Sequence, residues 1–190
     1  MSIAKSGNLK FMKTRMESEE VLYAEDPIVS VTDEDLEVLK CRANVNSRNR
    51  IRLCAHPHVS DKLHEMIIIL KRNAYFPPHK HIKRSESLHI IEGIADMVVF
   101  NDDGSIFQVL PLGGPGSGRS WYCRLNSSVY HTLLIRSEFL IFHETINGPF
   151  QKGNNQLAPW APDGSDPKSN KRYLEQLDTL AARFMKNATS

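Results

Sequence analysis

Short apolar runs separated by turn-forming residues dominate the middle of the chain. Each run is bounded by Gly, Pro, Asn, Asp or Ser, and the six runs cover residues 66–70, 88–91, 97–100, 106–110, 129–135 and 139–142. Runs of this length and spacing are typical of β-strands joined by tight turns. Asp103-Gly104 lies between two of them, and a glycine there accepts the positive φ that a hairpin requires. We therefore predict an all-β sandwich or barrel.

Helical patterns flank this β-rich region. Thr32 followed by Asp35 resembles a helix start and predicts a short helix over 33–44. Apolar residues at 174, 177, 180, 181, 184 and 185 predict an amphipathic helix over 171–186. We divide the chain into an N-terminal extension (1–27, helical in part or disordered), a barrel domain with its helical lead-in (28–150), and an irregular tail with a helix packed on the barrel (151–190). Residues 149–167 should cross the surface without regular structure.

Composition narrows the class of protein. The 190 residues carry 24 Lys and Arg against 22 Asp and Glu, and no run of five basic residues occurs, so we expect no nucleic-acid partner. The three cysteines are widely spaced and form no CxxC pair, which favours a reducing compartment. No stretch approaches 18 apolar residues, so we expect a cytoplasmic protein without a membrane span.

One segment carries the spacing of a metal site. His79 and His81 are two residues apart, and residues two apart on a strand point to the same side. Glu86 follows after a turn and can return toward the same point. Imidazole nitrogens with one carboxylate oxygen suit a divalent transition metal ion such as Zn, Fe, Mn or Ni. His131 begins another apolar run and is the candidate fourth ligand, although a lone histidine there is more often an ordinary core residue.

These residues resemble the two motifs of the cupin superfamily. The first motif, HxH-x4-E-x6-G, matches at His79, His81, Glu86 and Gly93. The second, PxG-x2-H, keeps its histidine as His131 but has Asn126 and Ser128 in place of Pro and Gly. The resemblance implies a double-stranded β-helix (jelly roll) with a short N-terminal helix and a C-terminal helix outside the barrel. It also implies a metal bound by the three histidines and Glu86, and a homodimer.

A closer resemblance is to the WbuC-type cupin-fold metalloproteins, over about residues 30–180. It rests on the segments 50–52, 56–57, 100–104, 144–150 and 157–162, of which the APWAP stretch is distinctive. This resemblance implies a small-molecule ligand, such as a sugar or sugar nucleotide, in surface polysaccharide (O-antigen) metabolism. It supplies no reaction.

Three further residues are candidates for the pocket. The resemblance favours Glu144 as a pocket residue and acid/base group, against the alternative of a strand-end carboxylate in solvent. Arg52 and His56 are candidates for the pocket mouth, and for each a structural or surface role is equally compatible with the sequence.

Three functions are compatible with this set. The first is a metal-dependent enzyme, an isomerase, an epimerase or (with iron) a dioxygenase, in which Glu144 moves a proton. The second is a metal-containing module that binds or senses a sugar without turnover, which a solvent-facing Glu144 would favour. The third is a structural protein that lost its metal, which the intact first motif argues against, because burying such polar groups without a partner is costly.

Overall fold

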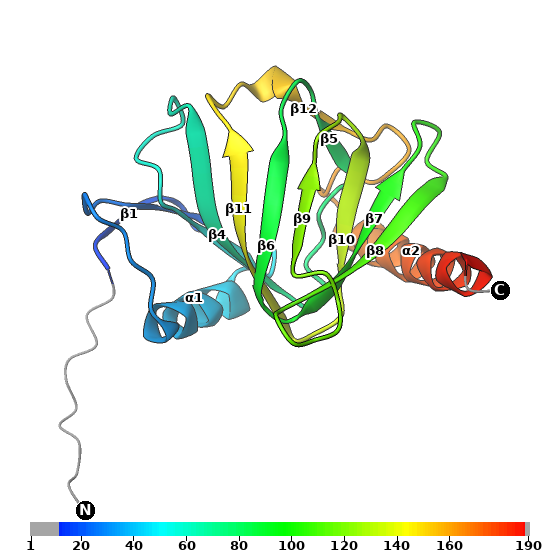
Figure 1. Ribbon diagram of the computed structural model, residues 1–190, viewed down its shortest axis with the longest axis horizontal. Coiled ribbons are helices and arrows are strands. Elements are labelled where there is room, and N and C mark those ends of the chain that lie inside the picture. Colours follow the sequence, from blue (N-terminus) through cyan, green and yellow to red (C-terminus); the bar gives the residue numbers. More distant parts are fainter. Residues whose placement is uncertain (1–11, 189–190) are drawn as a thin grey trace, which may run out of the picture.

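Two β-sheets face each other and enclose the core of the molecule, as the ribbon of this computed structural model shows (Figure 1). The structure describes residues 12–188. One sheet has seven strands in the order β1-β2-β3-β4-β11-β6-β9, and the other has five in the order β12-β5-β10-β7-β8. From β4 to β7 and again from β8 to β11 the chain alternates between the sheets. This is the predicted jelly-roll barrel, with one helix before it and one after it.

The strand bounds agree with the apolar runs and extend most of them. The first sheet contains β1 (Thr14–Ser18), β2 (Val21–Ala24), β3 (Arg50–Cys54), β4 (Leu63–Lys71), β6 (Glu86–Glu92), β9 (Tyr122–Leu125) and β11 (Phe139–Asn147). The second contains β5 (His79–His81), β7 (Ile94–Phe100), β8 (Ile106–Gly113), β10 (Tyr130–Ile135) and β12 (Asn155–Leu157).

Alternation along the strands places the core between the sheets. In β4, Met66, Ile68 and Leu70 point inward, and in β11 Phe142 and Ile146 do the same. Successive side chains of a strand face opposite sides, so one face of each strand joins this core and the other joins a helix or solvent. The core also receives residues of β6, β7 and β10.

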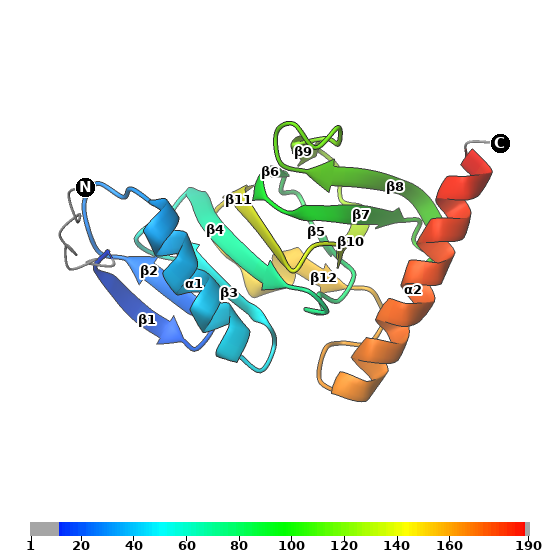
Figure 2. The same cartoon turned by 90° about the horizontal axis from the view of Figure 1, so that it is seen from below.

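Both predicted helices are present and pack outside the barrel. Helix α1 (Asp33–Val45) begins with a capping box between Thr32 and Asp35, which satisfies backbone donors that the first helical turn leaves free. Its buried side chains pack on the outer face of β3 and β4. Helix α2 (Pro167–Ala188) packs on the second sheet near β8. Figure 2 shows the two helices at opposite ends of the molecule.

The structure corrects two predictions about irregular segments. Residues 14–24 form β1 and β2 instead of an extension without strands, because Leu22 and Ala24 are buried beneath α1. The part of that prediction concerning residues 1–11 lies outside the described residues. Within the tail, residues 152–154 form a 3-10 turn and β12 pairs with β5.

Gly93 ends the first motif and shows why that position is a glycine. Its φ is +86°, and a Cβ there would lie 2.1 Å from the carbonyl oxygen of Phe139. A side chain at this position would be strained and would clash with backbone. The glycine therefore lets β6 turn directly into β7 beside β11.

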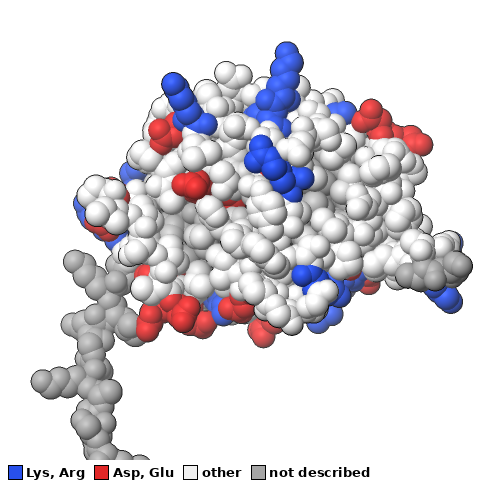
Figure 3. Space-filling model, in the orientation of Figure 1, with Lys and Arg blue, Asp and Glu red and all other residues white. Residues whose placement is uncertain are grey.

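Most of the face shown in Figure 3 is uncharged, and acidic side chains gather along its lower edge with basic ones among them. No helix among residues 12–188 has the length and apolarity needed to cross a membrane.

Candidate metal centre

Three histidines converge inside the barrel. His79 and His81 lie on β5, and His131 lies opposite His79 on the adjacent strand β10. One ring nitrogen from each lies within 4.8 Å of the others. The same-side placement follows from the two-residue spacing on a strand, and the register of β10 supplies the third ring.

Glu86 lies at the start of β6 and joins this cluster from the other sheet. Its side chain is 3% exposed, its Oε1 lies 2.6 Å from Nε2 of His131, and its Oε2 lies 3.1 Å from Nε2 of His81. The turn before Glu86 therefore brings the carboxylate back to the histidines, as the motif spacing implied.

The opposite nitrogen of each histidine already has an acceptor. Nδ1 of His79 lies 3.0 Å from the carbonyl oxygen of Pro77, and Nδ1 of His131 lies 3.0 Å from that of Val129. Nδ1 of His81 lies 2.7 Å from Oδ1 of Asn155. Carbonyl and amide oxygens only accept hydrogen bonds, so each Nδ1 carries a proton, and a ring in its neutral form presents an unprotonated Nε2.

This donor set fits a metal ion. Among the described residues, Glu86 Oε1 has no hydrogen-bond partner although His131 Nε2 is only 2.6 Å away. Two lone pairs at that separation repel unless a cation lies between them. With metal–ligand distances of about 2.0–2.2 Å, neighbouring donors in a coordination shell lie about 3 Å apart. The 3.1 Å contact of Glu86 with His81 has this spacing, and the 2.6 Å contact with His131 is shorter.

The pKa shifts of His79 and Glu86 favour the ligand-competent states, whereas that of His81 favours its protonated form. Burial, aided by His131 and His81, lowers the pKa of His79 to about 3, so that ring is neutral at physiological pH. Burial alone would raise the pKa of Glu86, but His131 and His81 outweigh it and hold that pKa far below its usual value. Burial lowers the pKa of His81, yet the Glu86 carboxylate raises it further, to a net increase.

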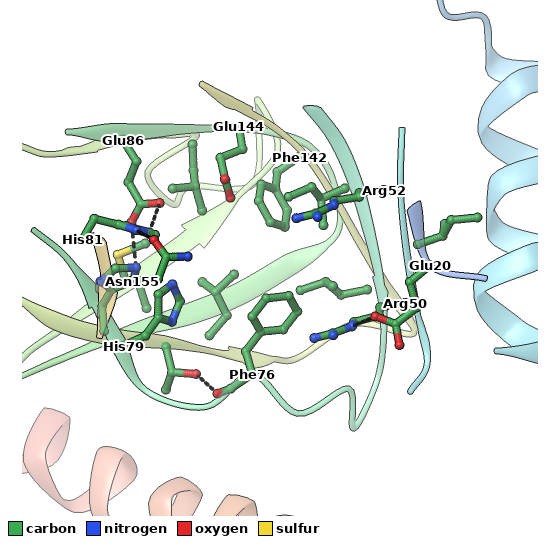
Figure 4. Close-up of a pocket in the computed structure, with 18 of the residues that line it drawn as sticks. Glu20, Arg50, Arg52, Phe76, His79, His81, Glu86, Phe142, Glu144 and Asn155 are labelled. Atoms are coloured by element: carbon green, nitrogen blue, oxygen red, sulfur yellow. Dashed lines mark hydrogen bonds and ion pairs between the residues drawn. The ribbon is translucent and has the colours of Figure 1, made fainter. Parts of the chain in front are cut away.

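A cavity of about 210 Å³ extends from this centre through the barrel. In Figure 4, His79, His81 and Glu86 lie at one end and Arg50, Arg52 and Glu20 at the other. The volume is below the roughly 300–1,000 Å³ typical of sites for drug-sized ligands. A sugar nucleotide would have to extend outside it.

Glu144 lines the middle of the cavity. It follows Phe142 by two residues on β11, so both side chains face inward (Figure 4). Burial, followed by the nearby Glu86 charge, raises the pKa of Glu144 to about 7. A carboxyl group with this pKa can both accept and release a proton near neutral pH.

The two remaining candidates differ in position. Arg52 lines the cavity. His56 is not among the lining residues, and its buried ring stacks on His64 with ring centroids 4.1 Å apart. His56 therefore packs within the fold, away from the cavity that Arg52 lines.

Sequence reasoning missed three groups at the site. Asn155 lies in the tail predicted to be irregular, and a three-residue strand has too few positions to show a pattern. Arg50 and Glu20 line the arginine end. Alternation with the apolar Ile51 and Leu53 was a signal for Arg50, since it places Arg50 and Arg52 on one face.

The loop before His131 is tied to β5 despite its departure from the second motif. Ser128, which stands where that motif has glycine, donates a hydrogen bond of 2.7 Å to the carbonyl oxygen of His81. The hydroxyl thus links the two histidine-bearing segments directly.

A family model of unknown function matches part of the chain. Residues 31–112, fewer than half of the chain, match the family described as a domain of unknown function (DUF6016). No curated protein matches the sequence.

Several solved structures are similar to part of the chain. Protein SO0799 from Shewanella oneidensis shares 8% identity over 59% of this chain and 75% of its own, with a TM-score of 0.48. Oxalate decarboxylase from Bacillus subtilis at pH 4.6 shares 21% identity over 52% of this chain and 24% of its own, with a TM-score of 0.42. The chain thus spans about a quarter of the length of that decarboxylase. Similarity at this level says nothing about activity.

Proposed function

We propose that this protein is a metal-dependent enzyme that acts on a small polar molecule inside the barrel. His79, His81, Glu86 and His131 hold one divalent transition metal ion, and Glu144 is the acid/base group. The observation that carries the proposal is the convergence of three imidazoles, each with its Nδ1 bonded to an acceptor, and a buried carboxylate whose Oε1 has no hydrogen bond among the described residues.

The chemistry divides between the metal and the chain. A bound divalent ion would supply Lewis acidity to a ligand oxygen and leave positions open for that ligand. The chain supplies the acceptors that orient the three imidazoles and the walls that restrict water. Glu144 can take a proton from a bound molecule and return it, which suits an isomerase or epimerase. A dioxygenase would require iron.

The position of Glu144 supports an enzyme over a module that binds or senses without turnover. The binding alternative predicts a Glu144 directed to solvent, whereas this side chain lines the cavity and has a pKa near 7. Such perturbed carboxyl groups are concentrated at functional sites.

The resemblance to WbuC-type proteins extends the proposal to surface polysaccharide metabolism, with a sugar as the substrate. The same resemblance proposes a homodimer in the cytoplasm. These remain proposals drawn from the motifs and the segments after the barrel.

The metal assignment predicts that His81→Ala empties the site. Elemental analysis of protein purified without chelator or nickel resin should give about one equivalent of transition metal per wild-type chain, and far less for His81→Ala. His89→Ala is the matched control, because His89 is an exposed histidine on the outer face of the barrel, beside Trp121. Full metal retention by His81→Ala would refute the ligand assignment.

Asn155 should raise the affinity of the site for the metal by orienting the His81 ring. Asn155→Ala removes the acceptor that orients the ring, so we expect metal affinity to fall roughly 10–100-fold. Competition with a chromophoric chelator measures this, with Gln156→Ala, an exposed neighbour on the same strand, as the control. Equal affinities of the two variants would show that the hydrogen bond to Asn155 is irrelevant to the metal.

The raised pKa of Glu144 predicts that the free energy of unfolding of the metal-free protein decreases as the pH rises. The folded state binds the proton more tightly than the unfolded state, so stability falls as pH rises from about 4.5 to about 7. Glu144→Gln removes this loss. Its free energy of unfolding should exceed that of the wild type by at most about 3 kcal/mol at pH 8 and by little at pH 5.

Urea unfolding at both pH values tests this prediction. Glu138→Gln is the control, because Glu138 is an exposed carboxylate in the turn before β11, and it should show no such divergence. A constant difference between Glu144→Gln and wild type across the pH range would mean that Glu144 ionises normally.

A further inference from the structure

Strand β3 places two arginines inside the barrel. Ile51 and Leu53 are buried under α1, so Arg50 and Arg52 face the opposite way and line the cavity. A guanidinium is always charged and is stabilised either by an anionic partner or by water. Arg50 is half-buried, whereas Arg52 is exposed where the cavity opens to solvent. The two arginines differ in whether the chain provides that partner.

Arg50 is satisfied by the chain. Its Nε donates to Oε2 of Glu20 at 2.7 Å, and its guanidinium lies 4.8 Å from the ring centroid of Phe76. Glu20 comes from the turn between β1 and β2, and its carbonyl oxygen accepts a hydrogen bond from the backbone N–H of Arg52. The N-terminal hairpin thus supplies the counter-ion for Arg50.

Arg52 has no such partner. Within residues 12–188, its guanidinium takes part in no hydrogen bond and no ion pair. In Figure 4 it points into the cavity toward Phe142 and Glu144. Because Arg52 is exposed, water solvates its planar fork in the free protein, and the fork stays available to bind a carboxylate with two hydrogen bonds.

The charges of the cavity favour an anion. Its ionisable lining, apart from the histidines, consists of two arginines and three glutamates, which give a formal charge of −1 when all are ionised. A divalent metal ion changes this to +1. A ligand with negative charge would balance the loaded site.

The walls favour a compact carbon body. Between the two ends they consist largely of apolar side chains, including Ile68, Leu70, Phe76, Leu133 and Phe142. Two polar groups there are already engaged, since the Thr132 hydroxyl donates to the carbonyl oxygen of Phe76 and Oδ1 of Asn155 accepts from His81. Most hydroxyl groups of a neutral sugar would therefore lose hydrogen bonds on entering.

We propose that the ligand is a small organic acid whose carboxylate is bound by Arg52 while the rest of the molecule extends toward the metal centre. This inference rests on the proposed function, because it assigns the substrate class of the same cavity. It narrows the sugar proposal to compounds that carry a carboxylate.

Malonate tests the inference, with malonamide as a neutral molecule of similar shape and glucose as a neutral polyol. Isothermal titration of metal-loaded protein should show binding of malonate and much weaker binding of both neutral compounds. Arg52→Gln should weaken malonate binding about tenfold or more, because it removes a charge-assisted hydrogen-bond pair. Arg52→Lys keeps the charge but not the planar fork, so its affinity for malonate should lie between those of the wild type and Arg52→Gln.

Arg72→Gln is the matched control, since it removes the same charge from an exposed position outside the cavity lining. The inference is overturned if Arg52→Gln and Arg72→Gln bind malonate equally well, if glucose binds more tightly than malonate, or if metal-loaded wild type binds no malonate. Metal content is measured on the same samples.

A wild-type protein that takes up no metal would contradict the proposed function instead. In that case the titration of metal-free protein tests Arg52 by itself, because its guanidinium and a carboxylate still attract each other. Loss of that binding in Arg52→Gln but not in Arg72→Gln supports the anion subsite, and equal binding rejects it.

Discussion

The Glu86 carboxylate, buried between two imidazoles, is the group on which the arrangement of the barrel interior depends. Removing an ionised carboxylate from water is expensive unless a cation or several hydrogen bonds replace the solvent. Here the neighbouring imidazoles direct their protons elsewhere, to Pro77, Val129 and Asn155. A divalent cation is the partner that satisfies the carboxylate and the three free nitrogens together. The strands β5, β6 and β10 and the tail strand β12 all contribute to holding this one point.

The same logic links the two ends of the cavity. At one end the metal-ligand cluster has no cation to bind among residues 12–188, and at the other the exposed Arg52 guanidinium has no anionic partner among the same residues. Glu20 neutralises Arg50, so of the two arginines in the cavity lining Arg52 is the one available to a ligand. Glu144 lies between these ends, where a proton-transfer group would reach a molecule bound to both. The N-terminal hairpin and the C-terminal tail thus complete a site that the central barrel strands begin.

Much of this was predictable where a residue pattern is local. The apolar runs located the strands, Thr32 and Asp35 located α1, and the spacing of His79, His81 and Glu86 placed their side chains together. The missed features depend on pairing between distant segments. Residues 14–24 have no alternation strong enough to mark strands, and they are ordered by burial under α1. Asn155 reaches His81 only because β12 adds to β5. His56 stacks on His64, and nothing in the sequence fixes the direction of the His56 ring after β3 ends.

X-ray absorption spectroscopy of the metal-loaded protein tests the central claim most directly. We predict a first shell of nitrogen and oxygen at about 2.0–2.2 Å, with the outer-shell scattering of three imidazoles and one carboxylate. A shell containing sulfur, or an oxygen-only shell without imidazole scattering, would place the metal elsewhere and contradict the assignment of His79, His81, Glu86 and His131.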